Sequence, residues 1–272
     1  MEAREEFEEM QNRWRIMEAT TIPVGQEYVI ETRDLVKIYK EGKVKAVNGL
    51  NLRIKKGEIY AFIGANGCGK TTAIKMLTGI LDPTTGSIRV LGMEMPKDRK
   101  FVSRHIGVAP QDVSLYTDMT VRENVKFFAD LAGVNKADFE TRFAELMDIL
   151  KLADRTGTFV ANLSGGMKRR VSIACALIHA PRLVFFDEAT VGVDPVLRKF
   201  FWEYFQRLKE NGMTLVVTSH VMDEAERADR IGLMRAGQLI DEGTPGELKD
   251  RHGVQSIEEV FLKLSGEAIT DE

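Results

Sequence analysis

The sequence lacks several features that define other classes of protein. It has only two cysteines, Cys68 and Cys175, which lie far apart and form no C-x-x-C pair, so neither a disulfide framework nor a zinc site is indicated. Its longest apolar runs, near residues 173–178 and 183–186, fall far short of the about 18 residues of a membrane-spanning helix. The N-terminus is acidic, without the basic-then-apolar layout of a signal peptide. We therefore expect a cytoplasmic protein that needs a partner in order to work at a membrane.

A strong charge of one sign is also missing. The 38 basic and 41 acidic residues are interspersed and give a net charge of −3. Proteins that bind a phosphate backbone usually carry a basic stripe, so nucleic acid is not expected as a partner. With 272 residues, 44% of them apolar, the chain can bury one substantial core, and we expect one compact module with subdomains.

The spacing of apolar residues predicts how the chain is divided. Residues 1–22 form a predicted helical extension, in which Trp14 and Met17 lie on one face. The main domain covers residues 23–250, and residues 251–272 form a helical tail. Within the main domain we expect short antiparallel strands at 28–31, 35–39 and 50–54, buried strands at 59–63, 183–186 and 214–218, a helix at about 195–211, and an inserted helical subdomain at about 112–165. This alternation indicates an α/β core interrupted by a helical insertion.

A glycine-rich segment stands between the buried strand at 59–63 and a predicted helix at 71–77. It fits the pattern G-x-x-x-x-G-K-[ST], in which glycines let main-chain amides point at a phosphate while the following helix directs its positive dipole end at the same point. Lys70 adds a full charge for the β- and γ-phosphates. Thr71 offers a hydroxyl to Mg²⁺, and Asp187, at the end of the strand at 183–186, would hold the same ion. The predicted nucleotide-binding residues here are Gly64, Ala65, Asn66, Gly67, Cys68, Gly69, Lys70, Thr71 and Thr72.

Two local patterns allow other interpretations. Cys68 is either a small loop residue, which we favour, or a reactive thiol whose pKa is lowered at a helix N-terminus. The segment Asn135-Lys136-Ala137-Asp138 has the form that reads guanine in GTPases, and the segment from Asp154 to Gly157 has the form D-x-x-G. In GTPases the D-x-x-G element comes first and each element follows a strand, whereas here the order is reversed and both lie in predicted helical surroundings. We therefore predict a helix connection and a helix end at these two places.

A second glycine motif, Leu163-Ser164-Gly165-Gly166-Met167, precedes a basic run and an apolar helix at 171–178, and Ser164 lies 23 residues before Asp187. Ser164 can cap that helix, while Gly165 and Gly166 expose amides at its positive dipole end, which makes a second phosphate-binding surface. One chain cannot easily close both surfaces on one nucleotide. Two chains in head-to-tail contact can, so we expect a dimer with ATP between the first loop of one copy and Ser164 to Gly166 of the other.

This segment resembles the signature motif of ATP-binding cassettes of the ABC type, and the resemblance extends over about residues 28–248. It implies a P-loop NTPase (RecA-like) α/β core with an N-terminal antiparallel β subdomain and an inserted α-helical subdomain. It also implies an ATPase that uses ATP and Mg²⁺. By the same match, Tyr39 is the aromatic residue on which adenine stacks, Gln111 reaches the metal and the attacking water, and Glu188 polarises that water.

Two more residues match the family's motifs. Asp194 lies in the loop that crosses the dimer interface and couples the two sites, and His220 matches the switch histidine that contacts the γ-phosphate. The family more often has Pro where this chain has Ala189 and Leu where it has Val193, which puts the stiffness of this loop in doubt. The remaining histidines have no such setting and are predicted to be structural; they are His105, His179 and His252.

The tail at 257–266, together with residues 191–195 and 222–227, resembles ATP-binding subunits of ABC-2 type exporters. This implies a protein on the inner face of the cell membrane, held there by a transmembrane permease on another chain and paired with a second ATP-binding subunit, which we expect to be an identical copy. A coupling helix of the permease would lie in a groove of the helical subdomain. Phe127, Phe128 and Phe143 are candidates for lining it, although core packing is favoured for each.

Three questions stay open on the sequence alone. The leading helix falls outside the resemblance, and it could pack on its own domain, on the permease, on the bilayer or on the second copy. A soluble ABC ATPase of translation or DNA repair is an alternative, but such proteins usually carry two cassettes with a linker or a long coiled coil, and the sequence shows neither pattern. A nucleotide-binding regulator without turnover is disfavoured because Asp187 and Glu188 are both present.

Overall fold

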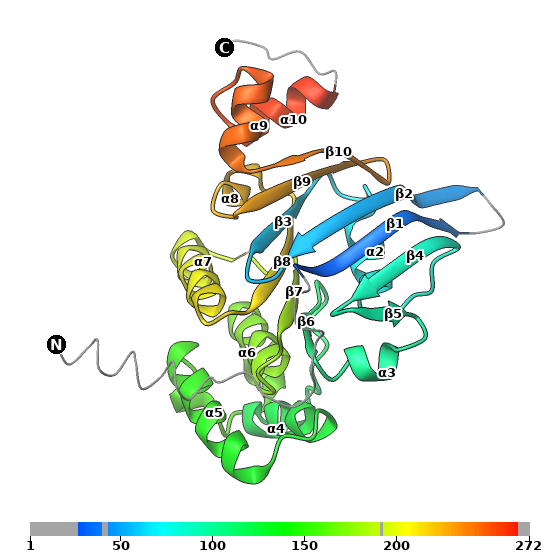
Figure 1. The fold of residues 1–272 in the computed structure, drawn as a ribbon. Coiled ribbons are helices and arrows are strands. Elements are labelled where there is room, and N and C mark those ends of the chain that lie inside the picture. Colours follow the sequence, from blue (N-terminus) through cyan, green and yellow to red (C-terminus); the bar gives the residue numbers. More distant parts are fainter. Residues whose placement is uncertain (1–26, 40–42, 191–192, 266–272) are drawn as a thin grey trace.

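The computed structural model describes residues 27–39, 43–190 and 193–265 of the chain, which form two sheets with helices around them (Figure 1). The strands are β1 (Tyr28–Tyr39), β2 (Val44–Lys55), β3 (Ile59–Ile63), β4 (Thr85–Val90), β5 (Met93–Met95), β6 (Ile106–Ala109), β7 (Leu183–Asp187), β8 (Thr214–Ser219), β9 (Arg230–Arg235) and β10 (Gln238–Gly243). The helices are α2 (Lys70–Leu77), α3 (Arg99–Val102), α4 (Val121–Leu131), α5 (Lys136–Ile149), α6 (Gly165–Leu177), α7 (Pro195–Glu210), α8 (Met222–Ala225), α9 (Pro245–His252) and α10 (Ile257–Ser265). Short 3-10 turns lie at η1 (Ala153–Arg155) and η2 (Val160–Asn162).

The larger sheet has the strand order β10-β9-β3-β8-β7-β6, and its strands are parallel except for the antiparallel β10. Every residue of β3 and β7 is buried, because successive side chains of a strand point to opposite faces and each face is covered here. Tyr60 and Phe62 pack into a core under the smaller sheet, whereas Ile59, Ala61 and Ile63 pack into a second core with α6 and α7. The carboxyl ends of β3, β7 and β8 therefore meet at one edge, where the predicted site residues follow.

The smaller sheet has the order β2-β1-β4-β5 and is antiparallel throughout. Two strands were predicted at 28–31 and 35–39, but the structure has one strand, β1, with register shifts between Thr32 and Leu35. Asp34 sits in this irregularity with φ 45°, and the Asn51 side chain bonds both its amide and its carboxylate. The local irregularity acts as a bulge that keeps both halves paired with β2, so the polar residues at 33 and 34 do not end the strand.

The helical insertion between β6 and α6 consists of α4, α5, η1 and η2. Asn135 caps α5, its side chain accepting from the Asp138 amide, and Asp154 lies in η1. The helical surroundings predicted for both GTPase-like patterns are thus confirmed. Phe139 and Phe143 are buried and stacked in the core, while Phe127 and Phe128 are half-buried on α4.

The C-terminal helices α9 and α10 lie at the opposite end of the molecule from α4 and α5 (Figure 1). Ile257 and Val260 of α10 are buried in the core shared with α6 and α7. The predicted boundary between the main domain and the tail, at residue 250, lies within α9. This division of the chain stays a prediction. The predicted helix at 1–22, with Trp14 and Met17, lies outside the described residues. Within the described ranges, no helix combines the length and the apolar character needed to cross a membrane.

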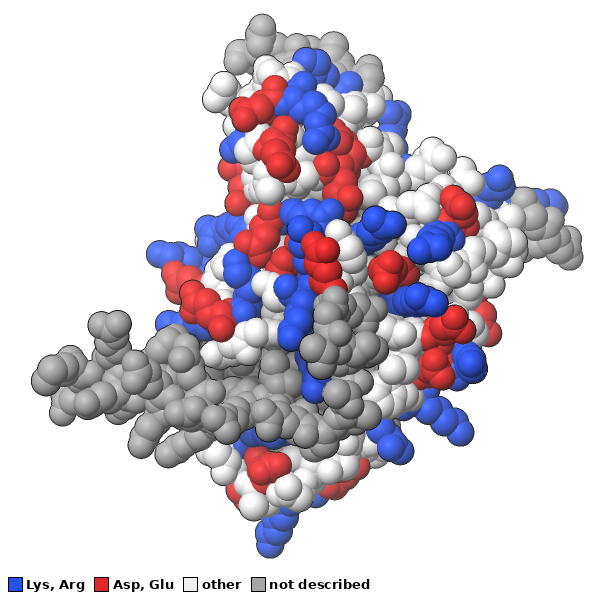
Figure 2. Space-filling view, viewed as in Figure 1, with Lys and Arg blue, Asp and Glu red and all other residues white. Residues whose placement is uncertain are grey.

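Charged side chains of both signs intermingle on the face seen in Figure 2. Among the described residues, some oppositely charged side chains form ion pairs: Arg230 lies 2.8 Å from Glu242, and Arg251 pairs with Asp241. On this face, basic residues therefore form no continuous stripe.

Candidate nucleotide-binding site

The glycine-rich loop follows β3 and leads into α2, which begins at Lys70. Gly69 has φ 113°, and a Cβ atom there would stand 2.2 Å from the Ala46 carbonyl oxygen. A Cβ on Gly64 would stand 2.2 Å from the Met234 carbonyl oxygen. The loop is thus wedged between the start of β2 and the end of β9, and only glycine fits at these two positions.

The Lys70 ammonium group lies inside this loop and is almost fully buried. It donates hydrogen bonds to the carbonyl oxygens of Gly64, at 2.6 Å, and Ala65, at 3.2 Å. Its Nζ also lies 3.8 Å from a carboxylate oxygen of Glu188. A buried cation at the N-terminus of a helix gives the loop the electrostatics of an anion-binding site.

Asp187 and Thr71 meet although they lie 116 positions apart in sequence. The Thr71 hydroxyl donates to Asp187 Oδ1 at 3.4 Å, and the Thr218 hydroxyl on β8 donates to the same oxygen at 2.6 Å. Asp187 is 3% exposed, which fixes its carboxylate at the end of β7 beside the loop. A carboxylate and a hydroxyl oxygen are donors that suit Mg²⁺, so the residues present fit the predicted ion.

Glu188 gathers the other predicted catalytic side chains. Gln111 Nε2 donates to Glu188 Oε2 at 2.9 Å, and His220 Nδ1 lies 3.7 Å from Glu188 Oε1. The backbone of Glu188 is left-handed, with φ 51°, and its amide donates to the Thr218 hydroxyl at 2.9 Å. β7 ends at Asp187, and the turn at Glu188 separates the two carboxylates.

Arg169 was not predicted from the sequence as a site residue, although it holds the main chain around this cluster. Its guanidinium group donates to the carbonyl oxygens of Pro110 at 2.6 Å, Gln111 at 2.9 Å and Glu188 at 3.4 Å. Burial lowers the pKa of the guanidinium group, and the charges of Asp187 and Glu188 oppose this. A signal existed, because Arg169 lies on α6 in phase with the buried Ser172 and Ile173.

Glu224 was also missed as a linking residue. It is buried on α8, four positions after His220, and accepts hydrogen bonds from the Thr190 hydroxyl and, at 3.4 Å, from Trp202 Nε1. Arg198 Nε lies 3.0 Å from its other oxygen as an ion pair. Glu224 thus ties the segment after Glu188 to α7 and to the segment that carries His220.

The second glycine motif forms the N-terminus of α6. Ser164 is the N-cap, its hydroxyl accepting from the Met167 amide at 3.3 Å, so the predicted cap is confirmed. Ser164 and Gly165 are exposed and Gly166 is half-buried. A Cβ on Gly165 would meet nothing within 4 Å, so a ligand or a second molecule can approach this helix end closely.

Two predicted residues lie at the edges of the site. Tyr39 is 36% exposed at the end of β1, and Lys37 Nζ lies 5.6 Å from the centre of its ring. Asp194 caps α7, its Oδ1 accepting from the amides of Val196 and Leu197 at 3.1 and 3.0 Å. Asp194 therefore has a structural role as the cap of α7, in addition to its predicted role at the dimer interface.

Comparison with known proteins fits this geometry. The family model described as ABC transporter matches residues 47–191. The chain belongs to the ABC transporter family. It is 38% identical over 243 residues to the probable multidrug ABC transporter ATP-binding protein YbhF of Escherichia coli, covering 88% of this chain but only 42% of that protein.

Other relatives in the ABC family are matched over more of their length. The Bacillus subtilis linearmycin resistance ATP-binding protein LnrL is 37% identical over 239 residues, which cover 88% of this chain and 76% of LnrL. The Rhizobium meliloti Nod factor export ATP-binding protein I is 38% identical over 242 residues, which cover 88% and 72%. The prediction of an ABC ATP-binding cassette is therefore confirmed.

Solved ABC structures confirm the fold. An ATP-binding subunit of an ABC transporter superposes with a TM-score of 0.81 at 28% identity, covering 87% of this chain and 99% of that one. A dimeric ATP-binding cassette in a post-hydrolysis state, bound to ADP and phosphate, gives a TM-score of 0.73 at 25% identity and covers 79% and 98%. The predicted P-loop core with its antiparallel β subdomain is thus confirmed, and the GTPase alternative is excluded. The roles of individual site residues remain predictions.

The structure of this ABC cassette favours one of the two interpretations of Cys68. The thiol is buried, and burial raises its pKa, although the Lys70 charge opposes this. A thiol with a raised pKa has little thiolate at neutral pH, so Cys68 is a small loop residue rather than a reactive group.

The three histidines other than His220 make the contacts of structural residues: His105 and His179 bond main-chain carbonyl oxygens, and His252 pairs with Asp241.

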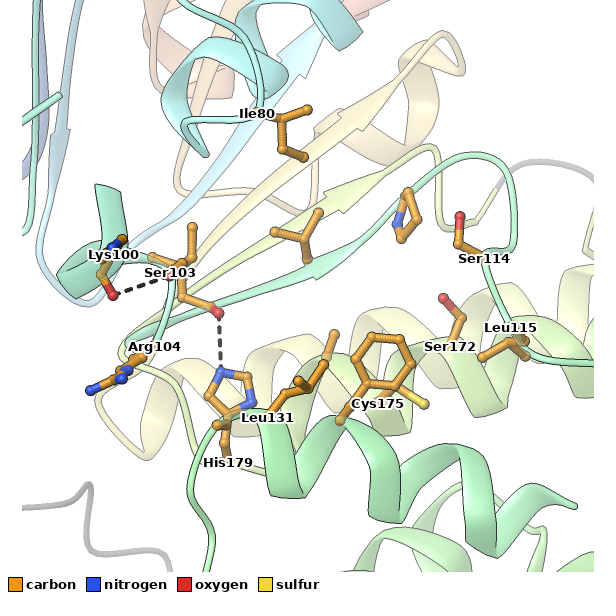
Figure 3. A pocket seen from close by; sticks show the side chains of 16 residues that line it. Ile80, Lys100, Ser103, Arg104, Ser114, Leu115, Leu131, Ser172, Cys175 and His179 are labelled. Carbon is orange, nitrogen blue, oxygen red and sulfur yellow. Dashed lines mark hydrogen bonds between the residues drawn. The ribbon is translucent and has the colours of Figure 1, made fainter. Parts of the chain in front are cut away.

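A cavity of about 640 Å³ opens where α4, α6 and β6 meet the loop after Gln111 (Figure 3). Ile80 lies across from Leu131 and Cys175 in this view, and Lys100 and Arg104 lie near one end. Pro110, which adjoins Gln111, forms part of the wall. Of the three phenylalanines considered for a groove, Phe128 lines this cavity, whereas Phe143 belongs to the core.

Proposed function

We propose that this chain binds and hydrolyses Mg-ATP as the ATP-binding subunit of an ABC-2 type exporter, in a dimer that encloses two ATP molecules. The observation that carries the proposal is the cluster around Glu188, where Gln111 and His220 face one carboxylate beside the buried Lys70. The likeness to LnrL and to the Nod factor export protein supports the exporter class.

Binding follows from the loop and its surroundings. Amides of residues 64–72 and the N-terminus of α2 hold the phosphates, and Lys70 exchanges its carbonyl partners for phosphate oxygens. Thr71 and Asp187, with Gln111 nearby, would hold Mg²⁺, which would supply positive charge to offset that of the phosphates. Adenine stacks on Tyr39, whose partly exposed ring is accessible at the end of β1.

Hydrolysis needs a water molecule placed in line with the γ-phosphate. Glu188 accepts a proton from this water, and the water oxygen forms a bond to the γ-phosphorus. The bond between the γ-phosphorus and the bridging oxygen breaks at the same time, and ADP leaves with that oxygen. Gln111 orients the water and Glu188, since its amide already bonds this carboxylate. His220 Nδ1 lies 3.7 Å from the other carboxylate oxygen of Glu188, and it is buried without a hydrogen-bond partner in the described part of the chain. The imidazole is therefore available to contact the γ-phosphate.

The second phosphate surface belongs to the opposite protomer. Ser164, Gly165 and Gly166 present exposed amides and a hydroxyl at the N-terminus of α6, which suits a γ-phosphate held by another copy. Asp194 and the exposed Val196 at the start of α7 lie at the same interface. Solved ABC cassettes of the same fold are dimers, which supports this arrangement.

The transmembrane permease docks in the cavity beside Gln111. The cavity has a mostly apolar lining, as a groove that binds a helix of a partner has, and its wall includes Pro110, which adjoins Gln111. Movement of the permease is thereby linked to the catalytic cluster, and the protein is held on the cytoplasmic face of the membrane. A solved structure of similar fold, cbiO1 of Clostridium perfringens, is part of the ABC transporter complex cbiONQ, which supports a partnership of this kind.

The test uses Glu188→Gln, which keeps the hydrogen bond to Gln111 within reach but removes the base. We expect ATPase activity to fall by about a hundredfold or more, with ATP binding retained and an ATP-dependent dimer accumulating. Turnover, ATP affinity and light scattering with and without Mg-ATP measure the three effects, alone and with any membrane protein that is encoded by a neighbouring gene. A strictly monomeric variant at saturating Mg-ATP, even with that partner, contradicts the proposal. Salt-sensitive association with ribosomes or DNA would instead favour the soluble alternative.

A further inference from the structure

We propose that Arg169 is a positioning residue for hydrolysis, which fixes Gln111 and Glu188 relative to each other; this rests on the proposed ATPase function. The guanidinium group of Arg169 donates to the main-chain oxygens of both residues and of Pro110. One rigid planar group thus joins the loop after β6 to the end of β7.

The two segments that Arg169 joins carry side chains that must meet. Gln111 Nε2 bonds Glu188 Oε2 at 2.9 Å, and this bond depends on the separation of the two main chains. Glu188 also holds a left-handed backbone, with φ 51°, which a residue with a side chain adopts only when its surroundings impose it. Thr218 holds the Glu188 amide, and Arg169 holds its carbonyl, so the peptide units on both sides of this residue are fixed.

Arg169 also connects this pair to the second glycine motif. It lies five residues after the N-cap Ser164 on the same helix, α6, which places it about 7.5 Å along the helix axis from that end. A helix moves as a rigid element over so short a distance. The end of α6 that faces the partner's nucleotide is therefore mechanically tied to the catalytic pair of its own chain.

The chain offers a matched control for a role in packing alone. Arg142 on α5 is as buried as Arg169, each residue being 9% exposed, and it too donates to a main-chain oxygen, that of Ile178. It also pairs with Asp138, and it belongs to none of the predicted site elements. Arg142→Met therefore removes a buried arginine without touching Gln111 or Glu188.

The experiment compares Arg169→Met, Arg169→Lys and Arg142→Met in the full chain. We expect Arg169→Met to lower kcat by about tenfold to a hundredfold, because small misplacements of catalytic groups cost this much, while the Kd for ATP changes by less than about threefold. Arg169→Lys keeps the charge but cannot reach all the carbonyl oxygens, so it should recover only part of kcat. Arg142→Met should lower Tm but leave kcat unchanged.

Amide hydrogen exchange supplies a readout that needs no turnover. Exchange across residues 109–112 and 187–190 should become faster in Arg169→Met, and in Arg169→Lys if the first variant does not fold, but not in Arg142→Met. Unchanged exchange in these segments would overturn the positioning role whether or not the wild type hydrolyses ATP. Losses of kcat that simply follow Tm across all variants would do the same. A wild type without ATPase activity would contradict the proposed function alone.

Discussion

His179 shows how a single side chain responds to its place in the fold. Its Nε2 bonds the Ile106 carbonyl oxygen at 3.0 Å, while Nδ1 is buried without a hydrogen-bond partner among the described residues. Burial lowers the pKa of this imidazole below its ordinary value of 6.5, and the charge of Arg142 acts in the same direction. The neutral ring is therefore the form that the folded chain prefers.

This preference predicts how stability depends on pH. Since the folded pKa lies below the unfolded one, His179 contributes stability that is fully present above about pH 6.5 and is lost as the pH falls through the folded pKa. The free energy of unfolding, measured with urea at about pH 7.5 and about pH 5.5, should fall less in His179→Gln than in the wild type. Equal pH dependence in the wild type and in His179→Gln would contradict the prediction.

At the same scale, the sequence predicted those site residues that belong to a continuous motif. Lys70 and Thr71 follow the glycines at fixed spacing, Asp187 ends a buried strand and Glu188 follows it directly, so the local pattern was enough to propose them. Arg169 and Glu224 were missed because their acceptors and donors come from distant segments that only the fold brings together. The pattern of one segment carries no information about a partner that lies on another.

At the scale of single elements, Asn135 at the start of α5 is predicted to cap the helix and not to bind guanine as in a GTPase. Its side chain accepts from the Asp138 amide at 2.9 Å, and the Asn135 backbone is extended, as at an N-cap. Asn135→Ala should therefore lower the free energy of unfolding by about 1 kcal/mol, seen as a lower urea midpoint, and leave the preference for ATP over GTP unchanged. Lys136→Ala, at the exposed first position of the helix, should have little effect. A shift in nucleotide preference would refute the cap assignment.

Elements with a buried, continuous apolar run were predicted closely, whereas those shaped by their neighbours were not. The strand expected at 59–63 is β3, and that expected at 214–218 extends by one residue in β8. By contrast, β1 was predicted as two strands, because the bulge at Asp34 depends on Asn51 of the neighbouring strand. The hairpin of β9 and β10 was not predicted; β10 is mostly half-buried and has no clear alternation of apolar and polar residues.

At the scale of the whole molecule, the proposed dimer depends on the exposed end of α6. Ser164→Arg places a large charged side chain where the partner's nucleotide would approach, while residues 64–72 of the same chain are unchanged. In the Glu188→Gln background, this variant should bind ATP with unaltered affinity but fail to form the ATP-dependent dimer, as seen by light scattering. Ser164→Thr, which can retain the cap, should still dimerise. Tight ATP-dependent dimerisation of Ser164→Arg would contradict the shared site.

The close packing of the phosphate-binding loop also has a consequence for the folding of the chain. Gly64 and Gly69 each leave room only for a main-chain oxygen, one from Met234 and one from Ala46, and the Gly237 amide donates to the Cys68 carbonyl oxygen at 2.8 Å. These segments come from both sheets, so the cradle takes its shape only when early and late parts of the chain have assembled. ATP therefore binds only the fully folded protein. At about 100 times its Kd, ATP stabilises the folded state by about 2.7 kcal/mol relative to incompletely folded states.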